Sequence, residues 1–262
     1  MDDDFFLINI PNFEPAYKSD TSYGWSNDSY YDNTIDLLCN TTGGYCMYCY
    51  NRILINGQNC ANIEHGVETS NSPKTKRLAD CVPNLGLACS KCNGKYKTRG
   101  QLKRAPSKKD ISFYERGTCK STSCKRACNK FINLRKKYTN KGHIILQPFG
   151  VTNELTGHEY KIQYDLLKGK YIPCHIEGGY TNDEIVFIQE HIKLFNLNDA
   201  KRKNREVAKY CKNVLKYHSI LEDIEYNNLV VDLFRNKLLN LEINKVEKIC
   251  AMVCTYALRN YT

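Results

Sequence analysis

The sequence predicts an α+β fold in which short strands and loops precede a helical C-terminal region. Three patterns support this. Apolar residues recur at helical spacing after residue 180, two alternating stretches flank a Lys-Gly turn at residues 168–169, and four cysteines form two C-x2-C pairs. The chain has 262 residues, of which 42% are hydrophobic and 25% charged, which excludes a fibrous or wholly disordered protein.

The N-terminal third shows few regular patterns. Residues 1–33 are acidic and aromatic without a sustained period, so we expect an extended arm. A short helix follows at residues 34–39, and short strands with a long polar loop are expected within residues 45–100. A helix is predicted near residues 125–138, and the apolar run at residues 143–149 is typical of a strand.

The C-terminal part has clearer signals. Residues 159–164 and 170–173 alternate around the turn, which predicts a β-hairpin. Thr181 and Glu184 form a capping box that begins a helix. Apolar spacing predicts further helices at residues 199–217, 222–241 and 244–258.

These elements suggest four domains. We expect an acidic N-terminal arm over residues 1–40, a compact core over residues 41–105, a basic linker helix with the hairpin over residues 106–180, and a helical domain over residues 181–262. The arm has two interpretations: it docks on a partner, or it lies across basic residues as an autoinhibitory mimic of nucleic acid.

Charge is unevenly distributed along the chain, whose formal net charge is +10. Residues 74–141 carry 20 Lys and Arg against three acidic residues, a net charge of +17. Such a block cannot form a packed core by itself, because charged side chains resist burial. Because aromatic residues are interleaved with the basic ones, the block could bind nucleic acid, with phosphate contacts from the basic side chains and stacking of bases on the aromatic ones. The alternative is that the block is a solvated lysine-rich surface.

The ends of the chain and its apolar stretches favour the cytoplasm. Three aspartates stand where a signal peptide carries positive charge. The longest apolar stretch, residues 249–258, is shorter than the roughly 20 residues of a membrane helix. We therefore expect a cytoplasmic protein without a membrane partner, whose 14 cysteines are reduced and serve as metal ligands or core residues.

The two cysteine pairs predict a structural zinc site. Cys46 and Cys49 form the first pair, and Cys89 and Cys92 form the second, with 39 residues between the pairs. Each pair presents two thiolates on one tight turn, so two pairs supply the four soft ligands of tetrahedral Zn²⁺. The alternative, four buried free cysteines, needs two coincidences of spacing.

The residues between the pairs are more specific. A strand-like segment ends in Glu64-His65, Asn84-Leu precedes the second pair, and Asn93 with a trailing lysine follows it. In this order, over about residues 43–100, the chain resembles the HNH endonuclease family. The resemblance implies a ββα-metal core within residues 41–105, in which zinc holds a strand and a helix together.

The resemblance also implies roles for individual residues. His65 would be the general base that takes a proton from the attacking water. Glu64 and Asn93 would bind one catalytic Mg²⁺ or Mn²⁺, although Asn93 could instead cap the helix. Asn84 would tie down the loop that holds the imidazole, a role more architectural than catalytic.

Basic residues downstream are candidates for binding nucleic acid, with DNA the most expected substrate. Residues on and just after the expected helix are placed to touch phosphates of the cleaved strand. The candidates are Lys91, Lys95, Lys97, Arg99, Lys103 and Arg104.

Within the family, the chain is most similar to HNH nucleases of Septu-type and retron-associated antiphage systems. Ile145 to Pro148, the hairpin, and Leu197-Asn198 with later arginines match the layout of that subset. The resemblance implies a partner ATPase, and the oligomeric state stays open. Pro73-Lys74 lies further from the histidine than in that subset.

Other interpretations remain open at this stage. Cys119, Cys124 and Cys128 could form a second zinc site with His143 or Cys174, although their spacing is irregular. Cys60 and Cys81 are either extra ligands or small buried residues. The protein as a whole could also be a non-catalytic zinc-finger binding protein, or a stand-alone restriction or homing nuclease.

Overall fold

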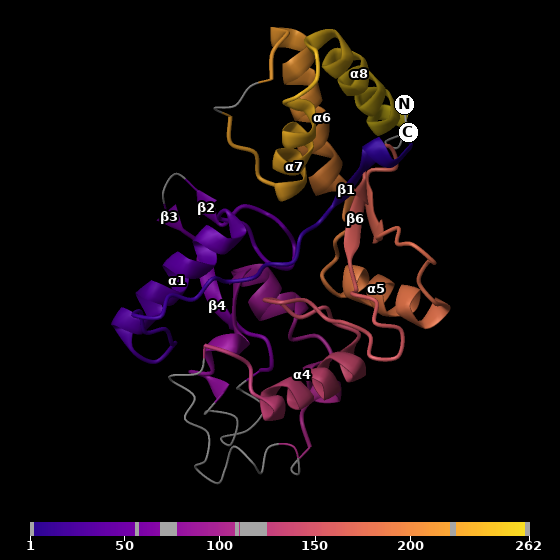
Figure 1. Ribbon diagram of the computed structural model, residues 1–262. Coiled ribbons are helices and arrows are strands. Elements are labelled where there is room, and N and C mark those ends of the chain that lie inside the picture. Colours follow the sequence, from indigo (N-terminus) through magenta and orange to yellow (C-terminus); the bar gives the residue numbers. More distant parts are fainter. Residues whose placement is uncertain are drawn as a thin grey trace. The chain divides into compact units, whose positions relative to one another are not determined.

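The computed structural model describes residues 3–55, 58–68, 78–107, 110, 125–220 and 224–259. The chain divides into two compact units. The core unit consists of Asn12–Cys49 and Ile53–Tyr160, and the helical unit consists of Met1–Pro11, Tyr50–Arg52 and Lys161–Thr262. The fold combines helices with small antiparallel sheets, in agreement with the expected α+β class (Figure 1).

The core unit begins with a helix that is longer than the sequence pattern predicts. Helix α1 (Asp28–Thr42) starts where the Asn27 side chain accepts a hydrogen bond from the Tyr30 N–H, at 3.2 Å. It ends at Gly43, whose φ of 62° is the left-handed conformation that glycine adopts without strain. Ile35 and Leu38 bury one face of this helix.

Short strands follow α1 in the core unit. Strands β2 (Leu54–Ile55) and β3 (Gln58–Asn59) form one antiparallel pair. Strands β4 (Ala61–His65) and β5 (Leu85–Cys89) form a second antiparallel pair with Ile63 opposite Leu87. A 3-10 turn, η3 (Val82–Asn84), leads into β5, and a helical turn, η4 (Cys92–Tyr96), follows it.

Two further helices complete the described part of the core unit. The short helix α2 (Gln101–Arg104) packs against α4 (Asn129–Gly142), which buries Phe131, Leu134 and Tyr138. The helix predicted near residues 125–138 is therefore confirmed, with its ends shifted towards the C-terminus.

The strand predicted at residues 143–149 is wrong. Ile144, Ile145 and Leu146 are buried, but their backbone joins no sheet. The guanidinium of Arg135 instead donates to the carbonyl oxygens of Leu146 and Pro148, each at 2.6 Å. A buried arginine thus satisfies backbone acceptors that a neighbouring strand would otherwise have used.

The helical unit contains a three-stranded antiparallel sheet with the order β1-β6-β7. The predicted hairpin is confirmed as β6 (Ile162–Asp165) and β7 (Lys170–Pro173). The Asp165 carboxylate accepts from the Leu167 and Lys168 N–H groups, which closes the turn between them. Strand β1 (Leu7–Asn9), preceded by the 3-10 turn η1 (Asp3–Phe6), pairs with β6, so the start of the expected arm is part of this sheet.

Four described helices make up the rest of the helical unit: α5 (Asn182–Leu194), α6 (Ala200–Tyr217), α7 (Leu229–Leu238) and α8 (Ile243–Arg259). The predicted capping box of Thr181 and Glu184 is present at the start of α5. Helix α7 begins later than predicted, because the Asn228 side chain caps it by accepting from the Val230 N–H at 3.0 Å. Helices α6 and α8 pack against each other (Figure 1).

None of the helices that the structure describes has the length and apolar content needed to cross a membrane.

Candidate metal centre and histidine site

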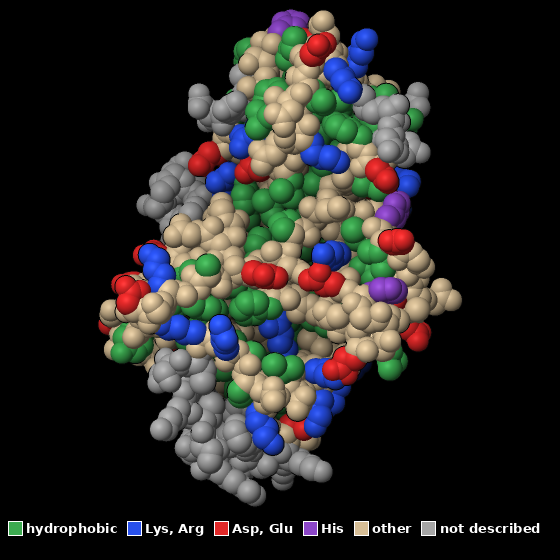
Figure 2. Space-filling view, viewed as in Figure 1, with side chains coloured by type: hydrophobic (Ala, Val, Ile, Leu, Met, Phe, Trp, Pro, Cys, Tyr) green, Lys and Arg blue, Asp and Glu red, His purple; other side chains and the backbone are tan. Residues whose placement is uncertain are grey.

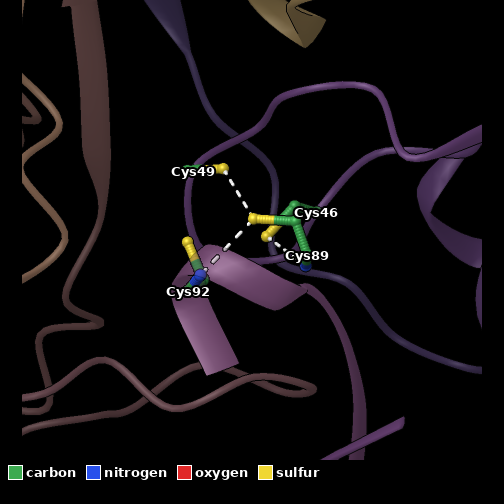
Figure 3. Close-up of side chains that lie close together, drawn as sticks. All are labelled: Cys46, Cys49, Cys89 and Cys92. Carbon is green, nitrogen blue, oxygen red and sulfur yellow. Dashed lines mark hydrogen bonds between the residues drawn. The ribbon is translucent and has the colours of Figure 1, made fainter. Parts of the chain in front are cut away.

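Four cysteines of the core unit converge on one point. Cys46 and Cys49 lie on the turn after α1, which Gly43 and Gly44 open with positive φ angles. Cys89 ends β5, and Cys92 begins η4. Their sulfur atoms lie within 4.8 Å of one another and point towards a common centre (Figure 3).

The surroundings of these sulfur atoms fit a bound metal ion. The Cys89 N–H points at the Cys46 sulfur at 3.3 Å, and the Cys92 N–H points at the Cys89 sulfur at 3.4 Å. Burial raises the pKa of the Cys46 thiol, because a buried thiolate loses its hydration. Four ionised thiols so close together need a divalent cation, and a set of four sulfur ligands is compatible with structural zinc. The prediction that these four cysteines form one cluster is confirmed.

The other cysteines that the sequence suggested as metal ligands lie either outside this cluster or outside the described residues. Among the described residues, no second set of three or more Cys, His, Asp or Glu side chains is close enough to hold a metal ion. Cys60 is exposed and Cys81 is buried, and neither joins the cluster. Cys119 and Cys124 lie outside the described residues, so the second zinc site that would use them stays a prediction.

Glu64 and His65 are the last two residues of β4, which pairs with β5, the strand that ends at Cys89 of the cysteine cluster. Glu64 pairs with Gly86, and His65 pairs with Leu85 at the end of the ladder. A Cβ atom at Gly86 would lie 3.2 Å from the Gln147 carbonyl oxygen and 3.4 Å from the Glu64 carboxylate. The glycine therefore leaves the space that the Glu64 side chain occupies.

Glu64 is completely buried, and its carboxylate interacts with two other side chains. Its carboxylate forms an ion pair with the Lys97 ammonium and accepts a hydrogen bond from the Tyr48 hydroxyl at 3.0 Å. Lys97 also donates to the carbonyl oxygen of His65. The pair thus links the start of the segment after η4 to the backbone of the histidine.

This arrangement does not fit the expected role of Glu64 as a ligand of catalytic Mg²⁺ or Mn²⁺. A magnesium ion keeps several waters and needs accessible oxygen ligands. The Glu64 carboxylate has no exposed surface, and an ammonium group already neutralises it. We therefore assign no reaction step to an ion bound by Glu64.

Two of the expected nucleic-acid contacts are corrected by the structure. Lys97 and Arg104 are only 2% and 3% exposed, so neither can reach a phosphate from the surface. Arg104 donates to the Tyr138 hydroxyl at 2.9 Å and pairs with Glu68 at 3.1 Å. Both cations are buried because each has an acidic partner and carbonyl acceptors inside the core unit.

The remaining four candidates are solvent-exposed: Lys91, Lys95, Arg99 and Lys103. Lys91 and Arg99 lie over the Tyr96 ring, at 5.5 and 5.2 Å from its centroid. These contacts keep two cations near one aromatic ring. On the face of the molecule seen in Figure 2, coloured Lys and Arg side chains are interspersed with Asp and Glu, so no unbroken basic patch is visible there.

Asn84 holds both ends of the segment between the two strands, as expected. Its Oδ1 accepts from the Val67 N–H at 2.7 Å, and its Nδ2 donates to the carbonyl oxygens of Val67 and Leu78 at 3.1 and 3.3 Å. The Gly66 N–H donates to the Asn84 carbonyl oxygen at 2.7 Å. Asn84 is 1% exposed, so these bonds are shielded from water.

His65 is half-buried and held in one orientation. Its Nε2 lies 3.1 Å from the Ala79 carbonyl oxygen, which can only accept, so Nε2 carries the proton in the neutral ring. Nδ1 is then the basic nitrogen. Burial lowers the pKa of His65, against smaller opposing effects of the Ala79 carbonyl and the Asp80 carboxylate. A lowered pKa keeps Nδ1 available as a proton acceptor at neutral pH.

Asn93 lies one residue after Cys92, within the first turn of η4, and is half-buried. The residue preceding this turn is Lys91, so the alternative in which Asn93 caps it is wrong. Ligation of a metal by Asn93 stays a prediction.

Sequence reasoning missed two residues beside His65. The Trp25 ring packs edge-on against the imidazole, with 5.5 Å between ring centroids. Asp80 accepts from the N–H groups of Trp25 and Ser26, both at 2.9 Å. Because Trp25 and His65 are 40 positions apart in the sequence, no local pattern signals this contact.

Comparisons of the chain with family models, with curated proteins and with solved structures found no match.

Proposed function

We propose that the chain is an endonuclease of the HNH type, which hydrolyses phosphodiester bonds in nucleic acid and holds a structural zinc ion on its four clustered cysteines. DNA is the expected substrate. The observation that carries the proposal is the state of His65, at the end of a strand, with Nε2 committed to a carbonyl and Nδ1 left basic.

The order of the elements supports this proposal. A cysteine pair, a two-stranded pair whose first strand ends in Glu64-His65, and a helical turn that begins at the second cysteine pair follow one another in the core unit. This is the order implied by the resemblance to HNH endonucleases. A zinc-finger protein that only binds nucleic acid has no use for an imidazole oriented by a buried asparagine and a carbonyl.

The residues of the chain divide the work as follows. His65 Nδ1 accepts a proton from a water molecule as that water attacks phosphorus, the bond from phosphorus to the leaving oxygen breaks, and the leaving oxygen takes a proton from solvent water. Asn84 fixes the segment that supplies the Ala79 carbonyl. Lys97 positions the backbone of His65 while Glu64 balances its charge. HNH chemistry ordinarily uses a divalent ion to stabilise charge on the phosphate.

The test is a plasmid-cleavage assay on the full chain, with and without added Mg²⁺ or Mn²⁺. We expect His65→Ala to lower the cleavage rate by about 10²- to 10⁴-fold, the usual contribution of a general base. His175→Ala is the matched control, since His175 is exposed and lies in the helical unit. Full cleavage by His65→Ala would refute the mechanism.

The same assay separates the alternatives. Wild-type protein that binds plasmid but never cuts it, under any of these metal conditions, would favour the non-catalytic binding protein. Cleavage that appears only when the product of the neighbouring gene is added would favour the partner ATPase implied by the resemblance to Septu-type nucleases. Cleavage without any partner would favour a stand-alone nuclease.

A further inference from the structure

The segment before α1 holds the chain's only tryptophan beside the proposed base. Trp25 is 46% exposed, which is unusual for the largest apolar side chain. Its ring meets the His65 imidazole edge-on, with an interplanar angle of 71°. The indole therefore contacts the imidazole without stacking on it in parallel, while much of its surface is open to solvent.

The backbone that carries Trp25 is firmly held, although the side chain is exposed. The Asp80 carboxylate accepts from the Trp25 and Ser26 N–H groups and from the Ser26 hydroxyl. The Thr34 hydroxyl accepts from the Gly24 N–H and is also within 3.0 Å of the Gly24 carbonyl oxygen. None of these hydrogen bonds involves the indole, so replacing the ring leaves their donors and acceptors in place.

A Cβ atom at Gly24 would lie 3.3 Å from the Asp80 carboxylate and 3.4 Å from Tyr30. The residue before the tryptophan is therefore packed closely against both the loop of His65 and helix α1. The turn thus holds the backbone of Trp25 in place, while its large aromatic ring is exposed.

The charge next to the ring is largely satisfied. Asp80 is the nearest acidic group that the structure connects to Trp25, and its two oxygens already accept three donors. Lys125, from the basic region, donates to the carbonyl oxygens of Lys18 and Ser19 in the same segment, at 2.5 and 2.7 Å. A nucleic acid that approaches this segment would therefore meet the Asp80 carboxylate, which is already hydrogen-bonded, and the positively charged Lys125.

We propose that Trp25 is a binding site for an unpaired nucleobase, which stacks on the indole next to the phosphate attacked by the water that His65 activates. A base buried in a duplex exposes no face, so the site selects nucleic acid that is single-stranded, frayed or unwound at the cleaved bond. This inference rests on the proposed function, because it places the stacked nucleobase beside His65, the proposed general base.

The single tryptophan makes the site directly visible, because stacking on a nucleobase quenches indole fluorescence. The experiment uses the full chain carrying His65→Ala, so that the oligonucleotide stays intact. The probes are a dye-labelled single-stranded DNA and an abasic oligomer of the same length and charge. Binding is read from the anisotropy of the dye, and stacking from the tryptophan emission.

We expect the base-containing strand to quench Trp25 in step with binding, and the abasic strand to bind without quenching. Trp25→Ala should weaken binding of the base-containing strand by about 5- to 150-fold, the range found for removal of one stacked base, and leave abasic binding unchanged. Trp25→Phe should restore most of the affinity. Equal quenching by both strands, or unchanged affinity in Trp25→Ala, would overturn the inference.

The outcome is independent of whether the chain cuts nucleic acid. Cleavage by wild-type protein without quenching would leave the nuclease proposal standing and remove the stacking site. Quenching without cleavage would keep the stacking site on a protein that only binds. If nucleic acid binds but leaves Trp25 unquenched, the exposed ring serves another occupant, such as a protein partner.

Discussion

At the scale of single residues, Glu64 and Lys97 form the most consequential pair in the core unit. Both side chains are at most 2% exposed, and they meet as an ion pair. Breaking a buried pair leaves one charge without a partner, which typically costs about 3–5 kcal/mol. Replacing both partners with apolar residues costs much less, because no charge is stranded.

We therefore expect Glu64→Leu and Lys97→Met each to lower the free energy of unfolding by about 3 kcal/mol or more, and the double variant to be more stable than either single variant. Urea denaturation followed by circular dichroism measures this. Lys136→Met, which breaks a partly exposed pair with Glu154 in the same unit, should cost less than about 1 kcal/mol. Additive losses in the double variant would mean that the two groups do not act as a pair.

Asn84 provides a second prediction at this scale. Asn84→Ala removes one acceptor and two donors, leaving the buried Val67 N–H without its side-chain partner. We expect a loss of about 2–4 kcal/mol in the free energy of unfolding and a lower cleavage rate, since the Ala79 carbonyl would no longer be fixed. Asn140→Ala, at an exposed position on α4, is the control and should change neither quantity.

The residue scale also shows how far sequence reasoning reaches. The cysteine pairs were predicted because their spacing is local, and Asn84 because it stands in a recognisable order of residues. Lys97 and Arg104 were misplaced because composition reports a charge but not its partner. Their acidic partners, Glu64 and Glu68, precede them by more than 30 residues and are found only by folding.

At the scale of elements, the cysteine cluster holds β5 and η4 to the turn after α1. The β4–β5 hairpin has five paired residues on each strand, which is too small to be stable on its own. Metal binding would then be part of its folding free energy. We expect about one zinc ion per chain from this cluster by elemental analysis, with Cys89→Ser losing the metal and destabilising the core unit.

Chelation should have the same effect on the wild-type protein, measured as a lower unfolding temperature by circular dichroism. Cys60→Ser is the control, since Cys60 is exposed and outside the cluster. Zinc content that is unchanged in Cys89→Ser would contradict the assignment. Two zinc ions per chain in the wild type would support the second site predicted for Cys119, Cys124 and Cys128.

Helix α5 carries a histidine whose burial makes the stability of the helical unit depend on pH. His191 is 1% exposed, and burial lowers its pKa to about 3. Above pH 6.5 neither the folded nor the unfolded state is protonated at this group, so its contribution to stability is complete there. As the pH falls from 6.5 towards 3, only the unfolded state gains the proton, and stability is lost.

We expect this histidine to account for about 2 kcal/mol of lost stability between pH 7 and pH 5, at roughly 1.4 kcal/mol per pH unit below 6.5. His191→Leu should remove that part of the pH dependence, as seen in urea denaturation at the two pH values. His158→Leu, in the core unit, should leave the dependence of the helical unit intact. An unchanged slope in His191→Leu would show that His191 does not control it.

Elements defined by local signals were predicted well. The β6–β7 hairpin and the Thr181 cap follow from turn and capping residues that lie within a few positions of each other. Strand β1 was missed because its partner β6 lies more than 150 residues away, as Leu7 pairs with Asp165. Residues 143–149 were wrongly expected to form a strand because their apolar run reports burial, while Arg135 determines their backbone pairing.

At the scale of the whole molecule, the net charge of +10 overstates the surface available to nucleic acid. Lys97 and Arg104 are inside the core unit, whereas Lys91, Lys95, Arg99 and Lys103 are exposed. Each phosphate contact releases counterions, so the logarithm of the binding constant falls with the logarithm of salt concentration by about 0.9 per contact on duplex DNA. The salt dependence therefore counts the basic side chains that face the nucleic acid.

If each of the four exposed residues forms one phosphate contact, their replacement by glutamine should reduce this slope by about 3–4 units. The measurement is fluorescence anisotropy of a labelled duplex between about 50 and 200 mM salt, the range over which such contacts are lost. The matched control replaces four exposed lysines of the helical unit, Lys209, Lys212, Lys216 and Lys245, and changes the net charge equally. If the control reduces the slope as much, the total charge of the chain attracts nucleic acid, and the exposed basic residues around η4 are not a specific phosphate-binding site. If only the first set does, the phosphate backbone lies along residues 91–103, within the same unit as His65.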